Sequence, residues 1–150
     1  MTTELLFYHL ETRPLEAVLP VLLEKTLQRG WKAVVEVGSS ERLEALDAAL
    51  WTYADDSFLP HGVVSGNHQD AGQPVLLTTG AENPNAAQVR FFVDRAVPRQ
   101  SDGYERFVYM FNGHDPDAVT EARGIWRQLK DTYMLTYWQQ DENGRWSKKA

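Results

Sequence analysis

The chain has 150 residues, of which 43% are hydrophobic and 24% charged, as is ordinary for a single soluble globular domain. It holds no cysteine, which excludes disulfides, thiolate metal sites and cysteine nucleophiles and fits the reducing cytoplasm. Its formal net charge of −6 at pH 7 argues against broad electrostatic binding to nucleic acid. We therefore expect one domain over residues 1–150, with no signal peptide and no membrane-spanning segment.

The first half of the chain alternates strand and helix patterns. A nearly continuous apolar run, Glu4–Leu10, is typical of a strand buried on both faces. After Pro14, apolar residues recur with helical spacing, and Pro20 either kinks this helix or marks its start. Lys32–Val37 predicts a second buried strand, and a Gly-Ser-Ser turn then caps a helix over Glu41–Tyr53. This order predicts a parallel sheet with right-handed crossovers.

The second half adds strands and one more helix. Ala54–Gly72 is a polar connection that an apolar run interrupts at Phe58–Pro60, and Ala81–Ala87 is a loop. Asp115 or Asp117 is expected to cap a helix over Ala118–Lys130, and the C-terminal tail is polar. Four apolar runs predict strands: Pro74–Thr78, Arg90–Val97, Arg106–Phe111 and Thr136–Trp138. The sequence therefore predicts an α/β fold with a mostly parallel central sheet.

The motifs give little support to catalysis or nucleotide binding. A dinucleotide site needs glycines in the first strand–helix turn, but this turn reads HLETRPL, and no GxxxxGK[ST] loop occurs. His61, His68 and Asp70 could form a metal triad, although unrelated loop or surface histidines are the simpler interpretation. No GxSxG elbow occurs. We therefore predict a protein that is not an enzyme by itself and that uses no cofactor or metal.

A first candidate binding surface follows the second predicted helix. Trp51 lies on the shoulder of that helix's apolar face, and Phe58 and Pro60 follow soon after. Exposed aromatic and proline residues that cluster are typical of a partner patch. In the alternative interpretation, Trp51 and Phe58 simply seal the edge of the sheet.

A second candidate surface is the cationic face of the last predicted helix. Arg123, Arg127 and Lys130 fall at i, i+4 and i+7, so they line one face beside Trp126. On an acidic protein, such a stripe favours a partner that is both acidic and apolar, such as a peptide tail. The alternative is an ordinary solvated face with Trp126 packed inward. Nucleic acid is the weaker candidate, because three cations do not overcome the charge of the chain.

These two segments resemble the chi subunit of bacterial DNA polymerase III, an accessory subunit of the clamp-loader assembly, and the ending TYWQQDENGRWSKKA resembles its alphaproteobacterial branch. The resemblance implies a Rossmann-like, three-layer αβα fold without catalytic activity, and the sequence itself lacks a phosphate-binding glycine loop. The competing class is a nucleotide- or nucleic-acid-handling enzyme of Rossmann-like fold. The resembling residues are Leu46-Asp47, Ala49-Leu50-Trp51, Ser57-Phe58, Pro60-His61, Ala122-Arg123, Trp126-Arg127 and Lys130.

The resemblance also implies that the cationic helix binds the acidic, Phe-terminated tail of single-stranded DNA-binding protein. Arg123 would pair with the terminal carboxylate or acidic side chains, and Trp126 would wall the slot for the terminal Phe. Arg127 would hold the acidic run, and Lys130 belongs to the same set. Val119 stands where some relatives carry Lys, so this patch is less cationic than theirs.

By the same resemblance, a second partner binds at Trp51, Phe58 and Pro60. That partner would be the psi subunit of the polymerase or a protein such as a helicase in its place. The chain would be a cytoplasmic monomer on its own and would contact DNA only through its partners.

Overall fold

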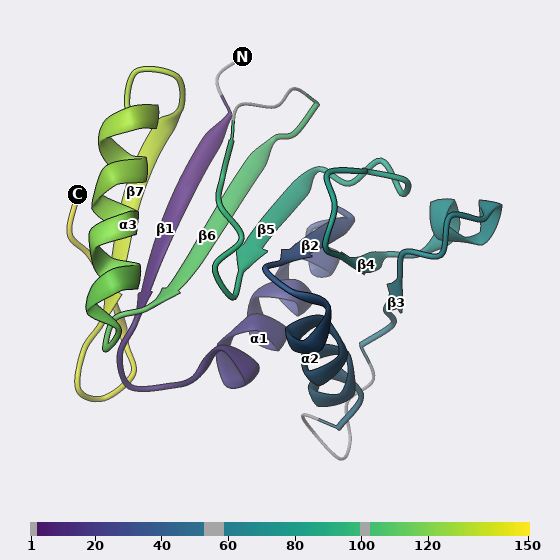
Figure 1. Ribbon diagram of the computed structural model, residues 1–150, viewed down its shortest axis with the longest axis horizontal. Coiled ribbons are helices and arrows are strands. Elements are labelled where there is room, and N and C mark those ends of the chain that lie inside the picture. Colours follow the sequence, from purple (N-terminus) through teal and green to yellow (C-terminus); the bar gives the residue numbers. More distant parts are fainter. Residues whose placement is uncertain (1–2, 53–58, 100–102) are drawn as a thin grey trace.

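The computed structural model describes residues 3–52, 59–99 and 103–150, which form a sheet flanked by helices (Figure 1). Within these ranges, no helix is both long and apolar enough to span a membrane. In chain order, the elements are β1 (Glu4–Leu10), α1 (Leu15–Gln28), β2 (Ala33–Val37), α2 (Ser40–Thr52), β3 (Gly62–Val63), the 3-10 helix η1 (His68–Gly72), β4 (Val75–Thr78), β5 (Val89–Val93), β6 (Arg106–Asn112), α3 (Pro116–Leu129), β7 (Met134–Gln140) and β8 (Trp146–Lys148).

The strands form one eight-stranded sheet within the described ranges, in the order β3-β4-β2-β5-β6-β1-β7-β8. Every neighbouring pair is parallel except β7 and β8, which are antiparallel. All residues of β2, β4 and β5 are buried, as strands covered on both faces require. The predicted α/β fold with a mostly parallel sheet is therefore confirmed.

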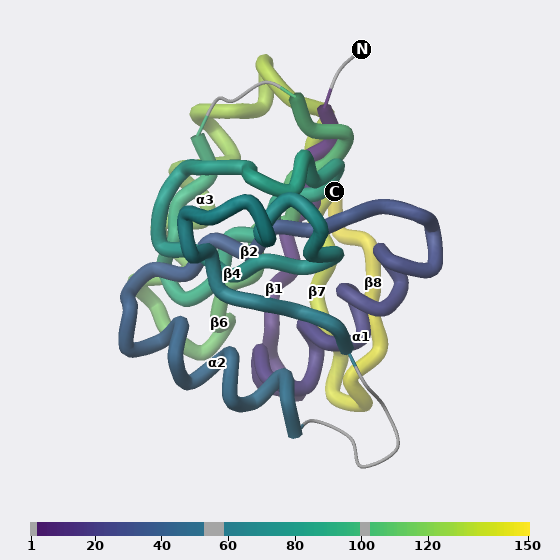
Figure 2. Tube along the Cα trace, turned by 90° about the vertical axis from the view of Figure 1, so that its right-hand side faces the viewer, coloured from purple at the N-terminus to yellow at the C-terminus, as the bar shows by residue number. Residues whose placement is uncertain are grey.

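Helices lie on both faces of the sheet, which gives three layers. Leucines and a valine of α1 and α2 share one apolar core with Val35, Leu77 and Phe91 of the strands. On the other face, α3 contributes Ala118, Ala122, Ile125 and Leu129 to a second core, which is rich in aromatic residues. Figure 2 shows α1 and α3 on opposite sides of β1. This arrangement is the Rossmann-like αβα fold.

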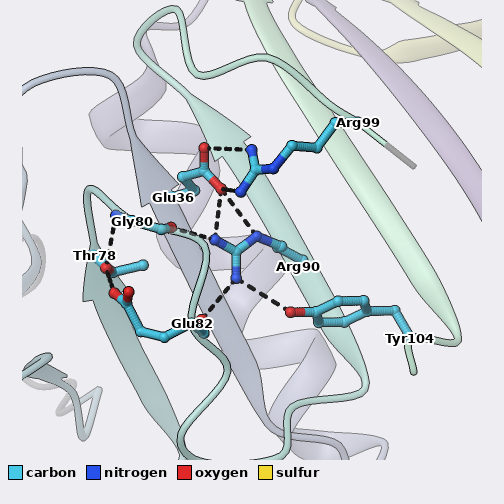
Figure 3. A network of polar contacts seen from close by, with 7 residues as sticks. All are labelled: Glu36, Thr78, Gly80, Glu82, Arg90, Arg99 and Tyr104. Atoms are coloured by element: carbon cyan, nitrogen blue, oxygen red, sulfur yellow. Dashed lines mark hydrogen bonds and ion pairs between the residues drawn. The ribbon is translucent and has the colours of Figure 1, made fainter. Parts of the chain in front are cut away.

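A buried ionic network holds the connections that lie over β2 and β5 (Figure 3). Arg90 is 2% exposed, and its guanidinium lies 2.5 Å from Glu36 Oε1. It also donates to the carbonyl oxygens of Gly80 and Glu82 and to the hydroxyl of Tyr104. Arg99 pairs with the same Glu36 at 2.9 Å. The network therefore fastens the segments after β4 and after β5 to the sheet, a role that the strand pattern of Arg90 does not predict.

The predicted strand Arg90–Val97 ends early, at Val93. Asp94 and Arg95 adopt φ values of 50° and 77°, which belong to the left-handed region and cannot continue a strand. The end of β2 approaches this turn so closely that a Cβ on Gly38 would lie 1.9 Å from the carbonyl oxygen of Asp94. The prediction of a strand over its last four residues, 94–97, was therefore wrong, because the backbone turns there.

Other element boundaries also differ from the prediction. The tail forms β8 against β7, and β7 extends on both sides of the predicted Thr136–Trp138. The connection Ala54–Gly72 contains β3 and η1. Pro20 lies buried inside α1, which begins at Leu15, so the interpretation that Pro20 marks the start of this helix was wrong. Tyr53 lies outside the described residues.

Candidate functional site

Helix α3 presents the cationic stripe because its two faces differ in sequence. The Asp115 carboxylate accepts hydrogen bonds from the backbone N–H groups of Asp117 and Ala118, so Asp115 is the cap, and Pro116 takes the first helical position. The small and apolar residues of α3 then face the sheet, which turns the charged residues outward.

The three predicted cations of this helix are exposed to solvent. Arg123, Arg127 and Lys130 are all exposed, and none of them forms an ion pair with any other described residue. Among the described residues, the Arg127 guanidinium donates to the carbonyl oxygen of Arg123 alone, at 3.3 Å. The structure therefore brings the cations together on one helix face and leaves their charges available to a ligand.

Trp126 is half-buried at the edge of this face. Its ring packs edge-on against Phe7 of β1, with centroids 5.2 Å apart, and against Tyr137 of β7, at 6.0 Å. Val119 is also half-buried and packs on the same core. The indole is therefore anchored by aromatic neighbours and keeps part of its surface in solvent. It is neither fully packed inward nor fully exposed.

A polar cluster that the sequence did not predict lies beside these aromatic residues. His9 Nδ1 lies 2.6 Å from the Tyr137 hydroxyl, and His9 Nε2 lies 3.0 Å from the Glu11 carboxylate. Gln139 Nε2 donates to that same carboxylate at 2.7 Å. Because side chains alternate along a strand, Phe7 and His9 share one face of β1 in register with Tyr137 and Gln139 of β7. The alternation along β1 places Phe7 and His9 on one face, but the cluster itself depends on the pairing of β1 with β7, which the sequence pattern does not give.

Burial dominates the proton affinities in this cluster. It lowers the pKa of His9 and raises the pKa of Tyr137. The Glu11 carboxylate opposes the change in the pKa of His9, and the positive charge of Arg123 lowers the pKa of both residues. The charge of Arg123 therefore acts on the cluster below α3, which ties the cationic face to the end of β1.

The second predicted surface lies at the end of α2. Trp51 is 51% exposed, and Pro60 is half-buried. Phe58 lies outside the described residues. An indole with half of its surface in solvent does not seal the edge of the sheet, so this interpretation was wrong for Trp51.

Trp51 is held in place by a buried histidine. The His61 ring lies 4.4 Å from the Trp51 ring, its Nε2 lies 3.0 Å from the Asp47 carboxylate, and its Nδ1 lies 2.8 Å from the carbonyl oxygen of Leu59. These contacts join α2 to the segment that precedes β3. His61 was expected to lie in a loop or on the surface. It does lie in a loop, between α2 and β3, but it is buried there, with its two ring nitrogens facing the Asp47 carboxylate and the Leu59 carbonyl oxygen.

The proposed metal triad has no support in the described residues. His61 faces Asp47, whereas Asp70 accepts hydrogen bonds from Ser65 and Gly66. Across residues 3–52, 59–99 and 103–150, no group of three His, Asp or Glu side chains is placed to hold a metal ion.

The first strand–helix turn is occupied by a side chain of the protein. The side-chain amide oxygen of Gln140, Oε1, accepts hydrogen bonds from the backbone N–H groups of Glu11, Thr12 and Arg13, at 3.0–3.2 Å. Pro14, at the helix cap, has no N–H to donate. In nucleotide-binding relatives of this fold, such N–H groups receive phosphate oxygens. Here they are already bound, which agrees with the lack of glycines in the turn.

The two predicted binding surfaces lie on opposite faces of the sheet. Arg123 and Trp126 belong to α3, and Trp51 belongs to α2 (Figure 1). The structure therefore assembles two separate candidate sites, with no residue shared between them.

Comparison with known proteins gives one family and one shared fold. A family model described as DNA polymerase III chi subunit, HolC, matches residues 1–135. A Rickettsia prowazekii (strain Madrid E) protein named probable DNA polymerase III subunit chi is 37% identical over 75 residues, which cover 50% of this chain and 44% of that protein. The aligned region thus spans less than half of that relative. The C-terminal domain of the DEAD-box protein Dbp5 superposes with a TM-score of 0.56 at 13% identity, over 92% of this chain and 91% of that one, which shows a common fold only.

Proposed function

We propose that this chain, which belongs to the DNA polymerase III chi subunit family, is a non-catalytic adaptor whose α3 face binds the acidic C-terminal tail of single-stranded DNA-binding protein. In this proposal the chain links that tail to the clamp-loader assembly. It works in the cytoplasm as a monomeric subunit and reaches DNA only through its partners.

The observation that carries this proposal is the set of exposed cations beside a half-buried indole. Arg123, Arg127 and Lys130 have no acidic partner among the described residues, so a ligand carboxylate would not have to displace one. A guanidinium binds a carboxylate through short, charge-assisted hydrogen bonds. The part of Trp126 that remains in solvent offers apolar surface to a Phe ring, whose burial contributes roughly 1.5–3 kcal/mol.

Val119 shifts the balance of this interaction toward apolar contact. It is half-buried on the same core as Trp126, at a position where the family resemblance places a cation in some relatives. The tail is disordered before it binds, so part of the interaction energy is spent on ordering it. We therefore expect a modest affinity that weakens as salt screens the charges.

Calorimetry with an acidic peptide that ends in Phe tests the α3 site. The wild-type chain should bind the peptide, and Arg123→Ala should weaken binding about tenfold, which is the worth of one charge-assisted hydrogen bond. Arg145→Ala, which removes an exposed arginine outside α3, is the matched control and should leave the affinity unchanged. Equal binding by the wild type and Arg123→Ala, or no binding by either, would refute the proposal for α3.

We propose that Trp51 and Pro60, together with Phe58, bind a second protein, the psi subunit or a helicase in its place. The support is the exposed half of Trp51, whose ring packs on the buried His61 in the segment before β3, where the partly exposed Asp47 carboxylate contacts that imidazole. A large aromatic side chain that is rigidly positioned and partly exposed is typical of an interface hot spot.

Pull-down experiments separate the second surface from the first. Trp51→Ala and Phe58→Ala should abolish capture of the second partner and leave binding of the acidic peptide unchanged. Thermal melting of both variants provides the control, because a loss of folding would show that these are core residues. Loss of peptide binding in a folded Trp51→Ala variant would show that the two surfaces are not independent.

The competing class, a nucleotide-handling enzyme, receives less support from the same residues. The N–H groups of the first strand–helix turn are bound to Gln140, and the turn holds no glycine. A nucleotide with measurable affinity for that turn would favour the enzyme instead.

A further inference from the structure

A groove on the sheet face opposite α3 carries features that neither proposed surface uses. It lies between α1 and the β7–β8 pair, over β1 and β6, and encloses about 390 Å³. Its walls come from parts of the chain that are distant in sequence. Leu6 and Val108 belong to the strands, Val18 and Leu22 to α1, and Trp138 and Trp146 to the last two strands.

The interior of the groove is apolar and partly aromatic. Tyr8 and Trp146 meet edge-on, with ring centroids 4.9 Å apart. Trp31 closes the end near the C-terminus of α1, where the Arg29 guanidinium lies 3.9 Å from its ring centroid. Leu6, Val89 and Val108 of the sheet and Val18, Val21 and Leu22 of α1 add aliphatic side chains to the lining. Such a surface favours aliphatic or aromatic side chains of a ligand.

The charged residues that line the groove are all cationic. They are Arg13, Lys25, Arg29 and Arg106, and the lining contains no Asp or Glu. Arg106 pairs with Glu4, whereas the other three form no ion pair within the described part of the chain. On a protein of net charge −6, this segregation of positive charge indicates an anionic ligand.

An unpaired buried donor lies in the same groove. Gln140 is 2% exposed and lines the groove, and its side-chain amide oxygen is fixed by the three backbone N–H groups of the first strand–helix turn. Its side-chain NH2 group has no hydrogen-bond partner among the described residues. A buried donor without a partner is costly, and a ligand carboxylate or carbonyl oxygen would satisfy it.

We propose that this groove binds an acidic peptide segment of a partner protein, with a large apolar side chain inserted between α1 and Trp146. The cations extend from Arg13, before α1, to Arg29, after it, and a helix of this length spans about 20 Å. An extended peptide of about six residues covers that distance, whereas a small anion reaches only one end.

The composition of the groove favours a peptide over single-stranded DNA. Nucleobases carry several polar edge groups, and the aliphatic floor offers them few partners, so burying them there would leave hydrogen bonds unmade. An acidic peptide places its carboxylates at the rim and only apolar side chains on the floor. This inference does not depend on the α3 proposal, because the groove and α3 lie on opposite faces of the sheet.

Fluorescence anisotropy on the whole chain tests the groove. The probe is a labelled heptapeptide that alternates Asp with Leu and Phe, and its amidated C-terminus removes the terminal carboxylate that the α3 site is proposed to bind. Val21→Glu puts a negative charge on the exposed wall of the groove, and Ala45→Glu adds the same charge to the exposed face of α2 as a control. The first variant should raise Kd at least tenfold, and the second should leave it within twofold.

A second pair of variants removes charge instead of adding it. Arg13→Ala with Lys25→Ala should raise Kd at least fivefold, whereas Arg127→Ala with Lys130→Ala removes as much charge from α3 and should leave Kd within twofold. This pair keeps the test decisive if Val21→Glu does not fold, as thermal melting would reveal.

Three results would overturn the proposal. The first is the absence of probe binding by the wild type, and the second is binding that is lost only in the α3 variant. The third is binding of a labelled ten-residue oligo-dT, weakened by the groove variants, when the peptide does not bind. None of these results decides whether α3 binds a Phe-terminated tail, which the calorimetric experiment tests separately.

Discussion

Two groups of arginines on the same side of the sheet have opposite surroundings. Arg90 is buried and contacts one carboxylate, two carbonyl oxygens and a hydroxyl group. Arg123 is exposed and has no ion-pair partner among the described residues. The guanidinium of Arg90 therefore serves the fold, because its contacts lie within the protein, whereas the guanidinium of Arg123 remains available to a partner.

This contrast follows from the cost of burying charge. A buried guanidinium must be paired and hydrogen-bonded, because its desolvation otherwise outweighs the energy of folding contacts. An exposed guanidinium keeps its hydration and costs little when left alone. Full pairing therefore indicates a structural arginine. A group of exposed cations that lack acidic neighbours, beside a half-buried aromatic ring, is better explained by binding.

The largest expected effect is on stability, at Arg90. Arg90→Ala leaves Glu36 with only the partly exposed Arg99 and removes the donors to Gly80 and Glu82, so unfolding should become easier by about 3 kcal/mol or more. Urea denaturation measures this change. Arg99→Ala, the control, should cost less than about 1 kcal/mol because that side chain is 46% exposed. Equal losses in the two variants would contradict the structural role of Arg90.

Trp126 is half-buried, so it shares features of the buried Arg90 and of the exposed Arg123. Its removal should therefore affect both stability and binding. Trp126→Ala removes two edge-on aromatic contacts and should cost about 2 kcal/mol of stability, less than a fully buried Trp would. It should also weaken binding of the Phe-terminated peptide. Trp126→Tyr keeps an aromatic ring at this position and should retain most of both properties. An unchanged peptide affinity in Trp126→Ala would show that the indole only packs the core.

Arg123→Ala should affect binding alone. Because Arg123 forms no ion pair with the residues that the structure describes, the stability of the variant should stay within about 0.5 kcal/mol of the wild type, while its affinity for the Phe-terminated peptide falls about tenfold. Raising the salt concentration should narrow the difference in peptide affinity between the wild type and Arg123→Ala, because exposed charges are screened. A marked loss of stability in this variant would remove the distinction between the two groups of arginines.

The sequence predicted the parts of the molecule that depend on local pattern. β1 was predicted at its observed bounds, and the stripe on α3 followed from helical spacing, because both properties depend on residues close together in the chain. The family resemblance also singles out Trp51 and Arg123. Their roles in binding stay predictions.

The features that escaped prediction depend on contacts between distant segments. The Arg90–Glu36 pair joins residues 54 positions apart, and the His9–Tyr137 contact joins residues 128 apart. Strand patterns predict that such residues are buried, but only the order of the strands in the sheet determines which polar side chains meet. The tail was predicted only as polar, and it forms β8 because β7 offers a neighbouring strand.

The smallest expected effect concerns His9. Burial disfavours the charged form of this residue, just as burial makes an unpaired charge on Arg90 costly. Burial lowers the pKa of His9 below its ordinary value of 6.5, and the nearby Glu11 opposes that change. Below pH 6.5 the unfolded chain therefore takes up a proton at this residue while the folded chain does not. Stability should thus fall as pH drops from 6.5 and should stop falling below the pKa of His9 in the folded chain.

Urea denaturation between pH 5 and 7.5 measures this dependence, with His9→Gln and the exposed His68→Gln as a matched pair. His9→Gln should flatten the pH dependence, whereas His68→Gln should leave it as in the wild type. Equal slopes in the wild type and His9→Gln would mean that Glu11 compensates fully for the burial of His9. The cluster below α3 would then resemble the paired network around Arg90, with each buried charge matched by a partner.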